Sequence, residues 1–247
     1  MRMFSRFFRK SIPCNDSDFS RFIVRDEQII CPVKPTVLIR GCQFNSNHYR
    51  NEFFGKIMGV CSARLRTRRM ERQAEFIAGR YLASRMLLEK GIDNKHVGRG
   101  CHGEPLWPLG FTGSISHTSN QVVCALACKS DIRYLGLDIE PTLTSPMAGE
   151  IEGLVINPDE KALAIDNGIL PAQLVSMAFS AKESLFKAVS HEAGTGFGFD
   201  SARVVGFHGT GLTLELSTGI SSSLPKGRRF DCFVGQHREC ILTLIAE

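Results

Sequence analysis

Two stretches of the chain repeat apolar residues with the period of an amphipathic helix. The first runs from about Arg68 to Glu89, and one stripe of it carries Met70, Ala74, Ile77, Tyr81 and Leu88. Gly91 follows at the place where a helix C-cap belongs. The second stretch covers roughly Leu170 to Ser190. A shorter helix is expected to begin near Pro158, with Asn157 as its cap.

Other segments have the composition and alternation of strands. They are QVVCALA, Arg133 to Glu140, SARVVGF, GLTLELS, RRFDCFVG and ECILTLIAE. Residues 1–60 are predicted to be irregular apart from a strand at Thr36 to Arg40, and residues 98–113, rich in Gly and Pro, are predicted to form a loop. Residues 142–160 are looser up to the helix near Pro158. QVVCALA and ECILTLIA are similar strands, which indicates two related α+β halves that meet near residue 135.

The segment GLDIEP at 136–141 places two carboxylates on one face of a strand. Alternation puts Asp138 and Glu140 on the same side, opposite the apolar residues Leu137 and Ile139. A solvated face on an edge strand is the simplest alternative, but the apolar neighbours favour a central strand. A hard divalent cation such as Mg²⁺, which prefers oxygen ligands, would relieve the repulsion between the two charges.

A second acidic position lies on the predicted helix at 170–190, in AKESLFKA. Glu183 and Lys187 are four residues apart and share a helix face, so a surface ion pair is the simple alternative there. A metal implies phosphate, and the groups that could bind phosphate are Ser116 and His117 in GSISHT and the arginines of RLRTRRMER at 64–72. A core or turn role for the first pair and a solvated helix start for the arginines stay open. Neither a Walker A pattern nor a G-x-G-x-x-G that opens a helix is present.

The composition is that of an ordinary globular protein of one large or two small domains. The 247 residues are 43% hydrophobic and 22% charged, with a net charge of +5. The mild positive charge suits an acidic or phosphorylated partner, and nothing resembles a nucleic-acid-binding tail. No apolar run is long enough to cross a bilayer, and the N-terminus lacks the apolar core of a signal peptide. The nine cysteines are scattered without a CxxC pair, which predicts reduced thiols in a cytoplasmic protein.

Three motifs stand in order along the chain: GEPLWPLGFTGSISHT, GLDIEP and FSAKESLFKA, with Asp138 and Glu183 45 residues apart. Together they resemble the 4′-phosphopantetheinyl transferases, in the branch of the enterobactin-synthase component and the surfactin-type enzymes. The resemblance runs from about Arg72 to Lys187. It implies an enzyme that moves the phosphopantetheine arm of coenzyme A to a serine of an apo acyl or peptidyl carrier protein and releases adenosine 3′,5′-bisphosphate.

The resemblance also implies roles for particular residues. Asp138, Glu140 and Glu183 would bind Mg²⁺, or Mn²⁺, together with the pyrophosphate, and Glu183 would accept the proton of the carrier serine. Lys187, with Lys182 assisting, would stabilise charge on the pyrophosphate. The residues expected to hold the nucleotide and its phosphates are Ser116, His117, Arg72 and Arg80. Some relatives have a lysine near the Gly-x-Pro turn, and here His102 would take its place in contacting coenzyme A.

The family fold is an α+β pseudo-dimer of two similar halves with coenzyme A in the cleft between them. The expected halves are residues 1–135, with the basic helix and the SISH loop, and residues 136–247, with the acidic strand and the KES helix. A monomer is expected, acting in siderophore or fatty acid biosynthesis. The alternatives are a non-catalytic coenzyme A or nucleotide-binding protein and a Mg²⁺-dependent phosphohydrolase.

Overall fold

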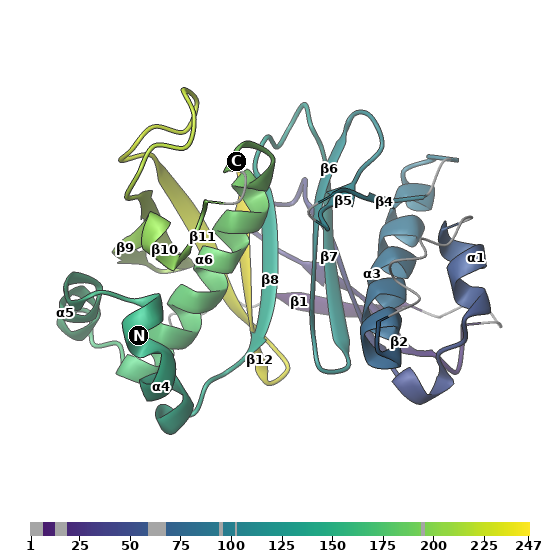
Figure 1. The fold of residues 1–247 in the computed structure, drawn as a ribbon, viewed down its shortest axis with the longest axis horizontal. Coiled ribbons are helices and arrows are strands. Elements are labelled where there is room, and N and C mark those ends of the chain that lie inside the picture. The colour runs from purple at the N-terminus through teal and green to yellow at the C-terminus, as the bar shows by residue number, and fades with distance from the viewer. Residues whose placement is uncertain (1–6, 13–18, 59–67, 94–95, 102, 194–195) are drawn as a thin grey trace. The chain divides into compact units, whose positions relative to one another are not determined.

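The computed structural model describes residues 7–12, 19–58, 68–93, 96–101, 103–193 and 196–247. These residues form a mixed α and β fold, and they separate into two compact units, Phe8–Arg133 and a unit that contains Tyr134–Glu247. Each unit has a five-stranded sheet whose neighbouring strands are all antiparallel. Each unit also has a long helix packed on that sheet (Figure 1).

The sheet of the N-terminal unit has the strand order β1-β2-β3-β7-β6. Its strands are β1 (Phe8–Ile12), β2 (Ile23–Ile30), β3 (Leu38–Phe44), β6 (Phe111–Thr118) and β7 (Gln121–Cys128). The remaining elements are η1 (Ser46–His48), α1 (Glu52–Met58), α3 (Met70–Glu89) and the short strands β4 (Gly98–Arg99) and β5 (Pro105–Leu106).

Helix α3 is the predicted basic helix, and it packs on β3 and β7 of this unit. The middle of its predicted apolar stripe lies in the core, where Ala74, Ile77 and Tyr81 are buried, whereas Met70 and Leu88 at the two ends of the stripe are exposed. Gly79 allows the close approach of β6, because a Cβ at that position would lie 2.8 Å from the Cγ2 atom of Ile115. The helix ends as predicted, and Gly91 follows it with a φ of +74° in the left-handed region that favours glycine.

The sheet of the C-terminal unit has the strand order β8-β12-β11-β10-β9. Its strands are β8 (Leu135–Pro141), β9 (Ala202–His208), β10 (Gly211–Leu216), β11 (Arg229–His237) and β12 (Cys240–Ala246). Its helices are α4 (Ser145–Val155), α5 (Pro158–Asp166), α6 (Pro171–Ala193) and the short η2 (Phe199–Ser201). Helix α6 packs on β8 and β12 (Figure 1).

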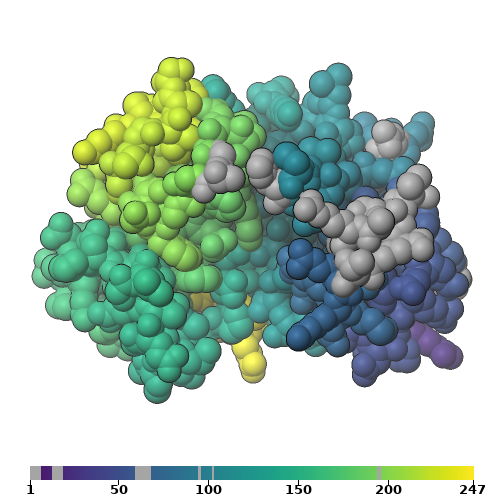
Figure 2. Space-filling model, in the orientation of Figure 1, coloured from purple at the N-terminus to yellow at the C-terminus, as the bar shows by residue number. Residues whose placement is uncertain are grey.

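The predicted start of α5 is confirmed, and it takes the form of a capping box. The Asn157 side chain accepts a hydrogen bond from the Glu160 N–H, and the Glu160 carboxylate accepts one from the Asn157 N–H. Pro158 occupies the first turn, where a missing N–H costs nothing. Helices α4 and α5 lie at the surface of their unit (Figure 2).

Several elements differ from the prediction. The described residues between 7 and 58 are more regular than predicted, since they contain β1, β2 and α1, and the predicted strand at 36–40 is β3. Strand β2 was hidden because it buries Asp26 and Glu27 in the middle of its apolar pattern. Helix α4 forms in a segment predicted to be loose, although Gly149 and Gly153 lower its helix propensity. Strand β8 lies at an edge of its sheet rather than at the centre.

Two further predictions from the sequence concern the state of the cysteines and the presence of membrane-spanning segments. All seven described cysteines are free thiols, and burial raises the pKa of Cys31, Cys124 and Cys232. Cys14 and Cys61 lie outside the described residues. Within the described part, no single helix is long and apolar enough to cross a membrane, and α5 with α6 passes that test only as a pair bent by 120°.

Candidate functional site

The acidic strand and the KES helix meet at a glycine. A Cβ added to Gly136 of β8 would lie 1.8 Å from the carbonyl oxygen of Ser184 of α6, so any other residue here would push the helix away. Asp138, two residues further along the same face of the strand, contacts α6 through its side chain. The predicted alternation is therefore confirmed, and the carboxylates of β8 face the helix that carries Glu183 and Lys187.

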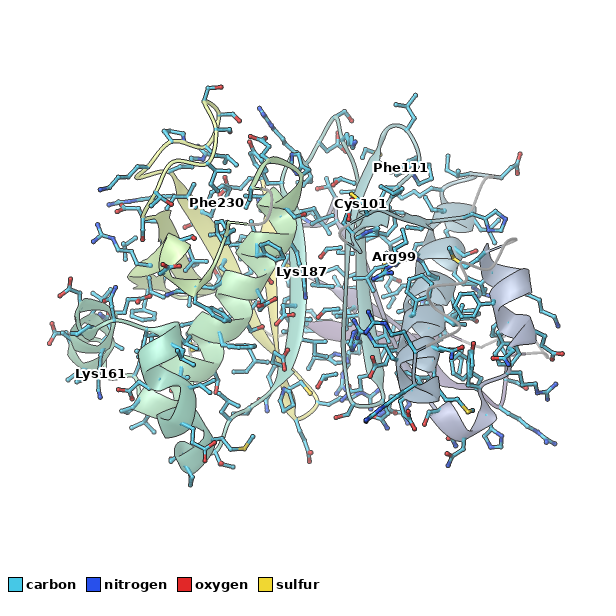
Figure 3. The ribbon with its side chains drawn as sticks, in the orientation of Figure 1. Arg99, Cys101, Phe111, Lys161, Lys187 and Phe230 are labelled. Carbon is cyan, nitrogen blue, oxygen red and sulfur yellow. The ribbon has the colours of Figure 1, made fainter. Side chains whose placement is uncertain are left out.

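Asp138 and Lys187 form the centre of this cluster. Asp138 is 1% exposed, and its Oδ1 atom lies 2.6 Å from the Lys187 Nζ atom. Its second oxygen, Oδ2, accepts a hydrogen bond of 2.8 Å from the Ser180 hydroxyl. Figure 3 labels Lys187 on α6. The structure thus brings together two of the residues that the motifs pointed to, one from each motif.

Glu140 and Glu183 stand near this pair, and the local charge is dominated by carboxylates. The pKa of Glu140 is raised to about 7, mainly by burial and also by the charges of Asp138 and Glu183, against the opposing effect of Lys187. Burial also raises the pKa of Glu183, again opposed by Lys187 and reinforced by Asp138. Three carboxylates share one ammonium group, so the cluster has the excess negative charge that favours an additional cation.

The cluster fits Mg²⁺ in the chemistry of its donors. Carboxylate oxygens are the ligands that this ion prefers, and it takes only a few of them from a protein. In the described part of the chain, no three acidic, histidine or cysteine side chains are grouped closely enough to hold one ion. The Lys187 ammonium lies against Asp138 instead and acts as its counter-charge.

Lys182, which was expected to assist at the pyrophosphate, lies elsewhere. It is 3% exposed, its Nζ atom is 2.9 Å from Glu160 Oε1, and it donates a hydrogen bond of 2.7 Å to the Val155 carbonyl. Lys182 and Glu183 are consecutive on α6, and consecutive helix positions point about 100° apart. The structure therefore gives Lys182 a buried partner within the core of its own unit and does not bring it into the Asp138 cluster.

In the N-terminal unit, two of the predicted phosphate-binding residues are in contact. Arg72 of α3 and His117 of β6 meet through the Arg72 Nη1 and His117 Nε2 atoms. Glu75 touches both side chains, at 2.8 Å from Arg72 Nη1 and 3.6 Å from His117 Nδ1. Ser116 is buried on the neighbouring position of β6. The predicted strand-end location of Ser116 and His117 is confirmed, since β6 ends at Thr118.

Arg80 lies on the same helix and is 5% exposed. Its guanidinium lies over the Phe76 ring at 4.6 Å and donates a hydrogen bond of 3.0 Å to the Gly98 carbonyl. Its pKa is lowered to about 10, mainly by burial and also by the nearby charge of Arg99. Its buried Nε atom has no hydrogen-bond partner among the described residues. His102 and the arginines at 64 and 66 lie outside those residues.

Sequence reasoning missed several polar residues that support these groups. Ser180 and Thr243 lie behind Asp138, Glu160 neutralises Lys182, and Glu75 links Arg72 to His117. Glu75 could have been found from the helix spacing, because residues three apart share a face. The others come from elements far apart in the sequence and gave no local signal.

One unit therefore holds carboxylates suited to a hard cation, and the other holds cationic groups suited to phosphate. Both are the usual parts of an enzyme that transfers a phosphate-containing group. The family described as the 4′-phosphopantetheinyl transferase N-terminal domain matches residues 62–127, and the 4′-phosphopantetheinyl transferase superfamily matches residues 134–238. The chain belongs to this superfamily, as its motifs predicted.

Individual relatives agree with this assignment. The chain is 36% identical to enterobactin synthase component D of Salmonella typhimurium over 185 residues, which is 74% of this chain and 75% of that protein. It is 31% identical over 153 residues to the 4′-phosphopantetheinyl transferase Npt of Nocardia iowensis, covering 62% and 64% of the two chains. The identity with the transferase Svp of Streptomyces mobaraensis is 29% over 168 residues, or 67% of each chain.

Proposed function

We propose that this protein transfers the 4′-phosphopantetheine arm of coenzyme A to a serine hydroxyl of an apo carrier protein. The observation that carries the proposal is the cluster of Asp138, Lys187 and the two neighbouring glutamates, on the strand and helix that the superfamily matches. The serine oxygen forms a new bond to the phosphorus that bears the arm. The bond from that phosphorus to the bridging oxygen breaks, and adenosine 3′,5′-bisphosphate leaves.

The chain's own residues would divide the work between charge and proton transfer. Asp138, Glu140 and Glu183 would hold Mg²⁺, which neutralises pyrophosphate charge when bound. Lys187, already an ion-pair partner of Asp138, would stabilise charge on the leaving phosphate. Glu183 would accept the serine proton, and its raised pKa favours this role because a base works best when its pKa is near the working pH.

The phosphates of the nucleotide would be held by the N-terminal unit. Arg72 and His117, which contact one another, would bind the 3′-phosphate, with Ser116 beside them. Arg80 would add a buried positive charge. We further propose the pseudo-dimeric arrangement of this family, with the coenzyme between the two halves 1–135 and 136–247. A monomer acting in the cytoplasm on an acyl or peptidyl carrier completes the proposal, and a siderophore pathway is favoured by the name of the Salmonella relative.

Intact-protein mass spectrometry of apo carrier proteins tests this function. Each carrier is incubated with the protein, coenzyme A and Mg²⁺, with and without a chelator, and the expected result is a metal-dependent gain of one phosphopantetheine arm. Asp138→Asn keeps the size of the side chain and should lower the transfer rate by about 100-fold or more. Asp166→Asn, at an exposed position on α5, is the matched control and should transfer at the wild-type rate.

The alternatives give different results in the same assay. Tight binding of coenzyme A without a modified carrier would overturn the transferase in favour of a binding protein. Loss of coenzyme A without a modified carrier would instead point to a phosphohydrolase.

A further inference from the structure

A row of buried hydroxyl groups lies behind Asp138 in the C-terminal unit. Ser180 and Ser184 come from α6 and Thr243 from β12, and all three are 0% exposed. The Ser180 Oγ atom is 2.8 Å from Asp138 Oδ2 and 2.9 Å from Thr243 Oγ1. Ser184 Oγ lies 2.8 Å from Thr243 Oγ1. The row therefore joins a carboxylate of the candidate site to the centre of the core.

The backbone fixes the positions of these groups. Thr243 is the residue directly opposite Asp138 in the pairing of β12 with β8, so the two side chains point to the same face of the sheet. Ser180 and Ser184 are one helical turn apart and face that surface from α6. The glycine contact at Gly136 holds α6 close enough for the hydroxyls to reach across.

The ionised carboxylate sets the direction of the hydrogen bonds. An ionised carboxylate can only accept, so Ser180 donates its single hydroxyl proton to Asp138 Oδ2. Ser180 Oγ can then accept from Thr243, and Thr243 Oγ1 can accept from Ser184. Thr243 Oγ1 also lies 2.9 Å from the Ser180 carbonyl, and Ser184 Oγ lies 3.2 Å from the Thr243 carbonyl, which gives both hydroxyls a second acceptor.

We infer that Ser180 is a positioning residue for Asp138, and that Thr243 and Ser184 support it in that order. The Ser180 hydrogen bond fixes Oδ2 toward the core and leaves Oδ1 directed at Lys187, where the cation of the proposed function would bind. This inference rests on the proposed function. Groups that orient a metal ligand from behind have marked effects on metal affinity, typically 10- to 100-fold. Partners further along a hydrogen-bonded chain act through the nearer ones, so their effects should decrease with distance.

Direct titration with Mn²⁺, followed by electron paramagnetic resonance without coenzyme A or carrier, tests the inference. Ser180→Ala should weaken Mn²⁺ binding by about 10- to 100-fold. Thr243→Val should have a smaller effect and Ser184→Ala the smallest. Ser176→Ala is the matched control, because Ser176 is a buried serine one turn earlier on α6 whose Oγ donates to the Ala172 carbonyl and accepts from the Leu143 N–H. That control should bind Mn²⁺ with wild-type affinity even if it unfolds more easily.

The possible outcomes separate the positioning role from the proposed function. Wild-type Mn²⁺ affinity in folded Ser180→Ala overturns the positioning role alone, as does an equal loss of affinity in Ser176→Ala. A wild-type protein that neither binds Mn²⁺ nor modifies any carrier overturns the proposed function as well. If Ser180→Ala fails to fold, Ser180→Cys and Ser184→Ala carry the test, and unchanged Mn²⁺ affinity in both overturns the inference.

Discussion

Lys182 and Arg80 are both buried cations, and the protein compensates their charges differently. Lys182 has a carboxylate partner at 2.9 Å and a carbonyl acceptor at 2.7 Å, all within the core of the C-terminal unit. Arg80 has a carbonyl acceptor and an aromatic ring, but its Nε atom is unpaired and no carboxylate contacts it among the described residues. Two buried charges that neutralise each other are each required by the fold, because loss of one leaves the other unpaired, whereas a buried cation without a counter-charge can be neutralised by an anionic ligand. We therefore propose a structural role for Lys182 and a binding role for Arg80.

The largest effect is expected from breaking the compensated pair. Lys182→Met would leave the Glu160 carboxylate buried without its cation, and this kind of loss costs about 3–5 kcal/mol of unfolding free energy. Urea denaturation measures the change. The coenzyme A affinity of the folded variant, measured by calorimetry, should stay within about twofold of wild type, because the inferred role is structural.

A double variant measures the interaction between Lys182 and Glu160 separately from the contribution of each residue alone. Adding Glu160→Gln to Lys182→Met removes the stranded charge and should recover about 0.5–3 kcal/mol of the lost stability. The opposite pattern, with normal stability and lost coenzyme A affinity in Lys182→Met, would restore the coenzyme contact that the motif predicted.

Removing Arg80, the cation without a counter-charge, should weaken coenzyme A binding and leave the stability nearly unchanged. Arg80→Met deletes a charged hydrogen-bond donor of about 1.5–3 kcal/mol, which corresponds to roughly a 10- to 100-fold weaker binding of coenzyme A. The unfolding free energy should change by less than about 1 kcal/mol, because the variant also relieves the burial of an unpaired charge. Arg85→Met on the same helix is the control and should keep wild-type affinity. Unchanged affinity in Arg80→Met would return Arg80 to a purely structural role.

The smallest effect is expected at Arg99, whose charge helps to lower the pKa of Arg80. Arg99→Gln removes this repulsion and should raise the unfolding free energy by no more than about 0.5 kcal/mol. Coenzyme A affinity, measured in the same titration, should change by less than about threefold at physiological salt. A tenfold loss of coenzyme A affinity would show that Arg99 itself binds phosphate, so that two arginines rather than one would be available to the ligand.

Residue spacing along the chain predicted the parts of the site that depend on a single element, namely which residues share one face of a strand or of a helix. The face of β8 that holds Asp138, and the helical spacing of Glu183 and Lys187, could be read in this way. The partner of Lys182 could not, because Glu160 begins a different helix and meets it through the fold. Strand β2 was missed for a related reason, since its buried Asp26 is compensated by Arg40 of the next strand at 3.7 Å. Charges inside a core look like surface positions until their partners are known.

Glu160 has a consequence for the motions of the C-terminal unit. Its carboxylate accepts hydrogen bonds from the Asn157 and Val204 N–H groups as well as from Lys182. One side chain therefore ties the start of α5 to strand β9 and to the middle of α6. Neither amide can exchange its hydrogen with solvent unless its hydrogen bond to this carboxylate breaks. The start of α5 and strand β9 should therefore open as one cooperative unit, on the slow timescale of the core rather than on the fast timescale of a surface helix.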